Sequence, residues 1–167
     1  MTRADAAPAF EQKVCDPGRL AQRLVELGRP LVFTNGVFDI LHRGHVTCLA
    51  HARALGATLV VGVNTDASVK RLGKGDDRPV NSLADRMAVL AALESVNLVT
   101  WFDDDTPLAL ILACRPDVLA KGGDWKVDEI VGAPEVRSWG GTVHSIPFEH
   151  ERSTSALLAK IKNESGM

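Results

Sequence analysis

The chain has 167 residues, of which 46% are hydrophobic and 24% are charged, so it suits one globular domain and excludes a disordered, collagen-like or simple coiled-coil protein. Its 19 basic and 21 acidic side chains give a formal net charge of −2. A protein that coats nucleic acid is far more basic, so we expect no nucleic-acid partner.

The cysteines and the apolar runs indicate where the protein works. Cys15, Cys48 and Cys114 are widely spaced and form no CxxC pair, which fits neither a disulfide framework nor a zinc site. Cys48 and Cys114 fall in apolar helical patterns that predict small buried side chains. The first ten residues lack the apolar core of a signal peptide, and no apolar run is long enough to span a membrane. We therefore expect a cytoplasmic protein with no membrane partner.

Residues 1–12 are expected to form a loose arm before a single domain over residues 13–167. A short helix is predicted over residues 20–27, followed by an alternation of buried-type strands and amphipathic helices. Ser82, Thr106 and Ser153 are the predicted N-caps of three of these helices. The predicted strands cover residues 31–35, 58–64, 96–102, 117–121 and 142–147, and the helices between and after them cover residues 45–55, 83–91, 107–114, 134–139 and 154–161.

This alternation is typical of a parallel sheet that is covered by helices on both faces and wound with right-handed crossovers. We predict an α/β fold, a Rossmann-like doubly wound parallel sheet of about five strands. Ligands of such sheets bind beyond the carboxyl ends of the strands, where the strand order reverses, so site residues should follow directly after strands. The polar connection over residues 65–81 is longer than a simple loop needs, which favours a functional lid.

Two histidines flank a glycine after the first predicted strand, in the segment Thr34–His45, which reads TNGVFDILHRGH. A helix N-terminus presents free amide donors and the positive end of the helix dipole, so this position attracts phosphate. Gly44 removes a side chain where a phosphate must come close, and His42 and His45 can point at the same oxygens. Two alternatives stay open for the histidines, a structural role and a metal pair, although no HExxH motif supplies further ligands.

Other phosphate-binding and catalytic motifs are missing from the sequence. No GxxxxGK loop, no GxGxxG turn after the first strand and no GxSxG nucleophile turn occurs. A dinucleotide oxidoreductase is therefore disfavoured, and a covalent enzyme intermediate has no evident nucleophile.

The HxGH string resembles the signature of the cytidylyltransferase-like nucleotidyltransferase superfamily. Further segments in the same order make the chain similar to the D-glycero-β-D-manno-heptose 1-phosphate adenylyltransferases, which form ADP-heptose for lipopolysaccharide core synthesis. The resemblance runs from about residue 12 to residue 162 and is to the stand-alone form rather than the form fused to a sugar kinase. The matching segments are residues 33–45, 63–69, 78–81, 121–124 and 153–155.

The resemblance implies a direct transfer, in which the sugar 1-phosphate oxygen attacks the α-phosphorus of ATP and pyrophosphate leaves. ATP is then a co-substrate accompanied by Mg²⁺, and a sugar 1-phosphate is the second substrate. Since no covalent adduct forms, the protein's task is alignment and charge stabilisation. The resemblance also implies a homodimer or a larger homo-oligomer.

The resemblance further implies roles at the phosphates for two histidines and one arginine, and the long polar connection itself offers further cations. His42 and His45 contact the triphosphate, and Arg86 resembles an arginine that reaches the phosphates in related enzymes. Among the cations of the long polar connection, Lys70 and Lys74 are expected to close over the phosphates, the alternative being solvated loop charge. The cations of that connection are Lys70, Arg71, Lys74 and Arg78.

Nucleotide-binding residues follow from the same resemblance. The strand end at Gly36 supplies backbone contacts near the α-phosphate, and Asp39 meets sugar hydroxyls or the metal. Lys121 opens a turn that cradles the base and ribose, and the Ser153–Thr154 turn holds the outer phosphates; Arg152 stands directly before it, where the family has an arginine several residues earlier. The expected nucleotide-binding residues are Phe33, Thr34, Asn35, Gly36, Phe38, Asp39, Gly44, Lys74, Lys121, Gly123, Asp124, Arg152, Ser153 and Thr154.

Three other functions stay open at this point. A cytidylyltransferase acting on a small phosphorylated acceptor such as glycerol 3-phosphate would use the same chemistry. A nucleotide-binding module without turnover, or a flavodoxin-like regulatory domain, could rely on backbone amides alone and leaves His42 and His45 unexplained. A metal-dependent hydrolase would hold zinc tightly, whereas the adenylyltransferase needs no protein-bound metal site.

Overall fold

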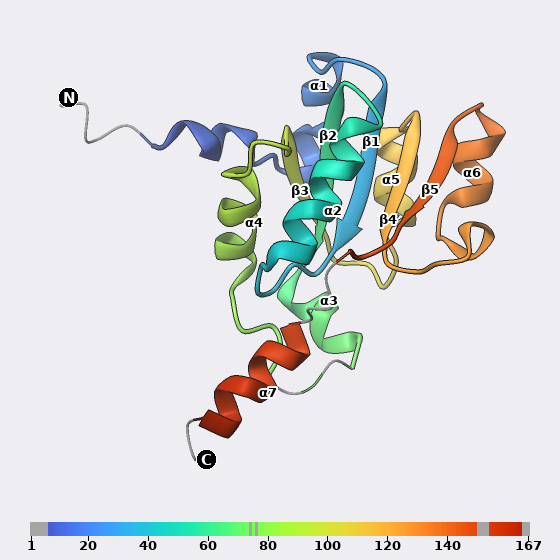
Figure 1. Ribbon diagram of the computed structural model, residues 1–167. Helices are drawn as coiled ribbons and strands as arrows, with labels where there is room; N and C mark the ends of the chain where they lie inside the picture. The colour runs from blue at the N-terminus through green and yellow to red at the C-terminus, as the bar shows by residue number, and fades with distance from the viewer. Residues whose placement is uncertain (1–6, 74, 76, 150–153, 165–167) are drawn as a thin grey trace.

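The computed structural model describes residues 7–73, 75, 77–149 and 154–164. Its centre is a five-stranded parallel sheet with the strand order β3-β2-β1-β4-β5 (Figure 1). The predicted α/β doubly wound sheet is confirmed. The strands are β1 (Leu31–Gly36), β2 (Thr58–Asn64), β3 (Leu98–Phe102), β4 (Val118–Gly122) and β5 (Thr142–Ile146).

Helices separate the strands, and side-chain caps explain where some of them begin. Ser82 Oγ accepts the backbone N–H of Asp85, as predicted, and begins α4. The cap position of α5 is occupied by Pro107, so the prediction of Thr106 as its N-cap is wrong. The helices are α1 (Leu20–Val25), α2 (Arg43–Ala54), α3 (Asp66–Arg71), α4 (Leu83–Ala91), α5 (Leu108–Cys114), α6 (Ala133–Ser138) and α7 (Thr154–Glu164), with 3-10 helices η1 (Ala9–Lys13), η2 (Pro17–Arg19) and η3 (Val127–Glu129).

The helix α3 lies inside the connection that was predicted to be a long polar loop. Thr65 caps it, since Thr65 Oγ1 accepts the backbone N–H of Ser68. Asn64 at the end of β2 donates to Ser68 Oγ at 2.9 Å, and Val69 is fully buried. A helix this short has too few apolar residues to show helical periodicity, which is why the sequence pattern missed it.

The segment before α1, which includes residues 7–12 of the expected arm, contacts the rest of the domain. Phe10 of η1 packs against the core beside α4, and Lys13 Nζ donates to the carbonyl of Leu93 at 3.1 Å. Val14 then forms a parallel bridge with Val99 of β3. Residues 1–6 lie outside the described part of the chain.

The sheet has two separate cores because successive side chains of a strand point to opposite faces. Leu31 and Phe33 of β1 pack on one face with α1, α5 and α6. Val32, between them, packs on the other face with α2 and α4. Both faces are therefore covered, as the continuous apolar strands predict.

The strand order reverses between β1 and β4, because the chain runs from β1 through β2 to β3 on one side and from β4 to β5 on the other. Figure 1 shows α3 and α7 beyond the lower edge of the sheet, where the arrowhead of β1 points. This edge holds the carboxyl ends of the strands, where sheets of this kind bind ligands.

Leu90→Ala tests the packing of α4 on the sheet. Leu90 is fully buried, so the substitution should lower the free energy of unfolding by about 2–5 kcal/mol, measured by urea denaturation. Val89 on the same helix is 51% exposed, and Val89→Ala should change it by less than about 0.5 kcal/mol. Equal losses in the two variants would contradict this packing.

Candidate active site

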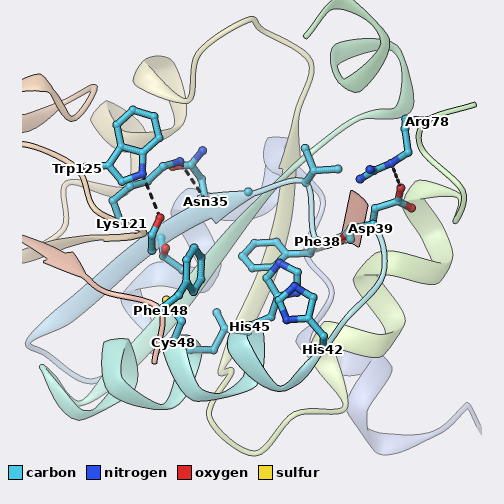
Figure 2. Close-up of a pocket in the computed structure, with 16 residues that line it drawn as sticks. Asn35, Phe38, Asp39, His42, His45, Cys48, Arg78, Lys121, Trp125 and Phe148 are labelled. Carbon is cyan, nitrogen blue, oxygen red and sulfur yellow. Dashed lines mark hydrogen bonds and ion pairs between the residues drawn. The ribbon is translucent and has the colours of Figure 1, made fainter. Parts of the chain in front are cut away.

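A cavity of about 520 Å³ opens at the carboxyl ends of β1 and β4 (Figure 2). Its walls come from the end of β1, the first turns of α2, the turn after β4 and the segment before α4. The predicted site residues that line it are Thr34, Asn35, Gly36, Phe38, Asp39, His42, His45, Lys121 and Thr154. The lining residues outside the predicted site are Val37, Cys48, Leu49, Arg78, Gly122, Trp125 and Phe148.

The two histidines lie together at the N-terminus of α2. His42 is the N-cap residue, and its carbonyl accepts the backbone N–H of His45 at 2.9 Å. The imidazole rings stack with their centroids 3.9 Å apart, and the ring of Phe38 meets His45 edge-on at 5.5 Å. The structure thus brings both histidines to the amide donors and the positive dipole end of a twelve-residue helix, which favour a bound anion.

The turn between β1 and α2 has an unusual backbone. Phe38 has φ 49°, in the left-handed region that residues other than glycine rarely adopt. Its ring lies against Gly36, where an added Cβ would stand 3.0 Å from Phe38 Cε2. Glycine at position 36 therefore lets the Phe38 ring fold back onto the strand end, beside the histidines. Backbone strain of this kind is common at functional sites, where the surrounding structure maintains it.

Asp39 has a fully buried carboxylate that holds the segment before α4. Its oxygens accept the backbone N–H groups of Val80 and Asn81 at 2.9 Å, and Nε of Arg78. Burial acts to raise the pKa of Asp39, but the N–H groups of Asn81 and Val80 together with Arg78 outweigh it and hold the pKa below its ordinary value. Asp39 lines the cavity and both of its oxygens accept hydrogen bonds within the protein, so its contact with sugar hydroxyls or a metal stays a prediction.

Arg86 does not line the cavity, contrary to the expectation that it reaches the phosphates. Its side chain is completely buried, and its guanidinium donates to the carbonyls of Asn81, Val37 and Asn64. It also pairs with Asp66 of α3 at 2.7 Å, an acidic partner too distant in sequence to be predicted. Arg86 therefore ties together the segments that surround the cavity.

Lys121 stands at the point where the strand order reverses. Its Nζ lies 3.2 Å from Asn35 Oδ1 and 5.8 Å from the ring centre of Trp125. The adjacent Gly122 cannot carry a side chain, because an added Cβ would lie 2.7 Å from Cys48 Sγ. A cation, an aromatic ring and a small residue thus gather between β1 and β4, which suits a nucleotide.

Other predicted residues lie outside the cavity lining. The side chain of Phe33 is in the core, and Lys70 is exposed on α3. Gly44 is buried in α2, and Gly123 and Asp124 follow β4 without entering the lining. Of the Ser/Thr turn, Thr154 lines the cavity and donates from Oγ1 to the carbonyl of Ile40 at 3.3 Å. Lys74, Arg152 and Ser153 lie outside the described residues.

The sequence carried a usable signal for some of the residues that the predictions missed. Trp125 and Phe148 follow the ends of β4 and β5, so the strand-end rule could have found both. Arg78 is the cation of the polar connection that lines the cavity within the described residues, whereas Lys70, which the sequence favours, does not line it. Cys48 is half-buried, packs against the core and also lines the cavity. Burial raises the pKa of its thiol, although the charge of Lys121 acts to lower it.

The described residues lack two other features, a metal-binding cluster and a membrane-spanning helix. They contain no group of three or more histidine, cysteine, aspartate or glutamate side chains placed to hold a metal ion. None of their helices is both long enough and apolar enough to cross a membrane.

Residues 33–162 match the cytidylyltransferase-like family, over most of the chain and all of the cavity lining. The chain belongs to the cytidylyltransferase-like family. A curated member named D-beta-D-heptose 1-phosphate adenylyltransferase, from Bordetella bronchiseptica, is 57% identical over 155 residues, covering 92% of this chain and 96% of that protein. The Bifunctional protein HldE of Salmonella dublin is 56% identical over 138 residues, which cover 83% of this chain and 29% of that longer protein.

Two solved structures are similar in fold to this chain. A lipopolysaccharide core biosynthesis protein from Thermoplasma volcanium has a TM-score of 0.60 and 29% identity, covering 73% of this chain and 98% of that one. The pantoate-beta-alanine ligase of Francisella tularensis has a TM-score of 0.57 at 14% identity, covering 85% of this chain and 68% of that one. At 14% identity, the similarity to the pantoate-beta-alanine ligase shows a shared fold alone.

Asp39→Asn tests the buried carboxylate through the dependence of stability on pH. Because the pKa of Asp39 is below its ordinary value of 3.8, the ionised carboxylate stabilises the fold above that pH, and this stabilisation is lost as the pH falls through the lowered pKa. At pH 7 the free energy of unfolding of the variant should be about 1–3 kcal/mol lower than that of the unaltered protein. This difference between the two proteins should shrink below pH 3.8.

Asp128→Asn, which alters an exposed pair with Arg137, is the matched control and should change stability little at any pH. Urea denaturation of the three proteins at pH 7 and pH 3 makes the comparison. If Asp39→Asn lowers the free energy of unfolding by the same amount at both pH values, the assignment of an ionised carboxylate to Asp39 is wrong.

Proposed function

We propose that the protein is an adenylyltransferase that joins ATP and D-glycero-β-D-manno-heptose 1-phosphate to give ADP-heptose and pyrophosphate, for lipopolysaccharide core synthesis. The observation that carries the proposal is the stacked pair His42 and His45 at the N-terminus of α2, inside the cavity at the β1–β4 reversal. The name of the relative from Bordetella bronchiseptica, D-beta-D-heptose 1-phosphate adenylyltransferase, supports the substrate, since that protein is 57% identical to this chain over 155 residues.

In the proposed reaction a phosphate oxygen of the sugar attacks the α-phosphorus of ATP. The new bond joins that oxygen to the α-phosphorus, and the bond to the bridging oxygen of the β-phosphate breaks as pyrophosphate leaves. No protein nucleophile takes part, so the protein acts by holding the reactants in line and by stabilising the charge that develops on the phosphates.

The cavity residues divide this task between them. His42 and His45 present ring N–H groups to the α-phosphate and the departing pyrophosphate, beside the amides of α2. Lys121 places a cation at the strand reversal, and Thr154 stands at the start of α7, where helix amides favour the outer phosphates. Trp125 and Phe148 offer aromatic faces near the same turn, suited to a base.

Mg²⁺ fits the cavity as a companion of ATP and not as an ion in a dedicated protein site. The described cavity lining contains one carboxylate, that of Asp39, and its oxygens are engaged by Arg78 and two backbone amides. Mg²⁺ commonly binds through substrate phosphates and water, where it offsets the triphosphate charge. We propose that it enters with the nucleotide.

The substrate assignment is tested by incubating the protein with Mg²⁺, ATP or CTP, and a panel of phosphorylated acceptors that includes heptose 1-phosphate and glycerol 3-phosphate. Pyrophosphate release is expected with ATP and heptose 1-phosphate. Release with CTP and glycerol 3-phosphate alone would replace this proposal by a cytidylyltransferase, and no release with any pair would favour a binding module.

His45→Ala should lower kcat about 10²–10³-fold while changing ATP affinity much less, because the imidazole is assigned to charge that develops in the transition state. His51→Ala is the matched control, since His51 is exposed on the same helix and outside the cavity lining. Steady-state kinetics and nucleotide titration measure the two effects. Equal losses in ATP binding and turnover would assign His45 to ground-state binding alone.

We further propose that the protein acts in the cytoplasm and, as the family resemblance implies, that it forms a homodimer or a larger homo-oligomer. The buried free thiols of Cys15 and Cys114 suit a reducing compartment, and burial raises the pKa of Cys114 to about 12. Analytical ultracentrifugation of the purified protein tests the assembly.

A further inference from the structure

Arg78 is a nearly buried cation in the cavity wall. Its side chain is 7% exposed, and it uses Nε to donate to the buried carboxylate of Asp39. Within the part of the chain that the structure describes, its terminal nitrogens have no hydrogen-bond partner, and Figure 2 shows them directed from Asp39 into the cavity. A guanidinium carries five N–H donors, so Arg78 can bind Asp39 and a second anion at once.

The cavity has cations on both sides of the histidines. Figure 2 shows Lys121 beside Asn35 and Trp125 on one side of His42 and His45, and Arg78 beside Asp39 on the other. Lys121 stands at the β1–β4 reversal, where sheets of this kind bind nucleotides. Arg78 comes from the segment that precedes α4, away from that reversal. The arrangement suits two anionic ligands that meet at the histidines.

We propose that Arg78 binds the phosphate group of the acceptor substrate, and that Asp39 is a positioning residue that holds Arg78 for this contact. The inference rests on the proposed function and deepens it, because it names the residue that selects a phosphorylated sugar over the free sugar. Arg78 bonds two oxygens of the acceptor phosphate, and a third oxygen attacks the α-phosphorus.

In-line displacement places the attacking oxygen and the leaving pyrophosphate on opposite sides of the α-phosphorus. An acceptor held at Arg78 would approach from the side of the histidine pair that is remote from Lys121. The assignment therefore gives the acceptor a direction of attack as well as a binding contact.

Asp39 positions Arg78 through hydrogen bonds to the neighbouring backbone as well as through its charge. The same carboxylate accepts backbone N–H groups of Val80 and Asn81, and the Asn81 amide donates back to the Asp39 carbonyl at 2.6 Å. The segment that carries Arg78 is thus bonded on both sides of Pro79 to one buried residue. Arg78 is held ready before the acceptor arrives, which reduces the ordering cost of binding.

The test compares Arg78→Gln and Arg78→Lys with the unaltered protein in the presence of Mg²⁺, ATP and heptose 1-phosphate. Arg78→Gln should raise the KM for heptose 1-phosphate about tenfold or more and the KM for ATP less than about threefold, because a charge-assisted contact to one substrate is lost. Arg78→Lys keeps the charge without the forked geometry and should give an intermediate KM. Arg137→Gln, which breaks an exposed pair with Asp128 outside the cavity, is the matched control and should leave both KM values unchanged.

A direct binding measurement separates a phosphate contact of Arg78 from a purely structural role, because a structural role would not change the preference for the phosphorylated sugar. By titration calorimetry, the unaltered protein should prefer heptose 1-phosphate to unphosphorylated heptose, and Arg78→Gln should lose most of that preference. Asp39→Asn should lose part of it while still binding ATP. The double variant Asp39→Asn with Arg78→Gln removes both charges, so it serves as the test if a single variant leaves a buried charge unpaired and fails to fold.

The outcomes separate the inference from the function on which it rests. A rise in the KM for ATP alone, equal rises for both substrates, or a preserved preference for the phosphorylated sugar would overturn the role of Arg78 while the adenylyltransferase activity stands. If the unaltered protein releases no pyrophosphate from ATP and heptose 1-phosphate, the proposed function itself fails.

Discussion

The buried guanidinium of Arg86 is the interaction on which the geometry of the cavity depends. It donates to backbone carbonyls in the turn after β1, at the end of β2 and before α4, and it pairs with Asp66 at the start of α3. An unpaired charge at such a depth is strongly unfavourable, so each of these segments must adopt the conformation that brings its oxygen to the guanidinium. Arg86 thereby positions three connections that the sheet alone would not fix, those after β1, after β2 and before α4.

Asp39 adds an opposite charge to the same framework. The negative Asp39 accepts backbone N–H groups of the segment 78–81, while the positive Arg86 donates to the backbone carbonyl of Asn81. Asn81 therefore contacts both buried charges, one through its N–H and one through its carbonyl. Asp39 and Arg86 are both buried, and a buried polar network of this kind is stable only when its charged members have hydrogen-bond partners, as these two have.

Much of the architecture could be predicted from the sequence because it depends on local patterns. Continuous apolar runs defined β2 to the residue, and the histidines next to Gly44 marked the start of α2 within two residues. The short helix α3 escaped because its fold depends on the Thr65 cap and the Asn64–Ser68 contact rather than on periodicity. For Arg86, the sequence could not reveal the partner Asp66 in α3, because the two residues are twenty positions apart and meet only in the folded chain.

The bridge between Val14 and Val99 has a consequence for the behaviour of the protein in solution. β3 is an outer strand of the sheet, and an outer strand presents unpaired backbone groups to any other extended chain. Here the backbone N–H of Cys15 donates to the carbonyl of Val99, and η1 packs beside α4. The segment before α1 thus pairs with part of the outer edge of β3 and shields this apolar strand against self-association.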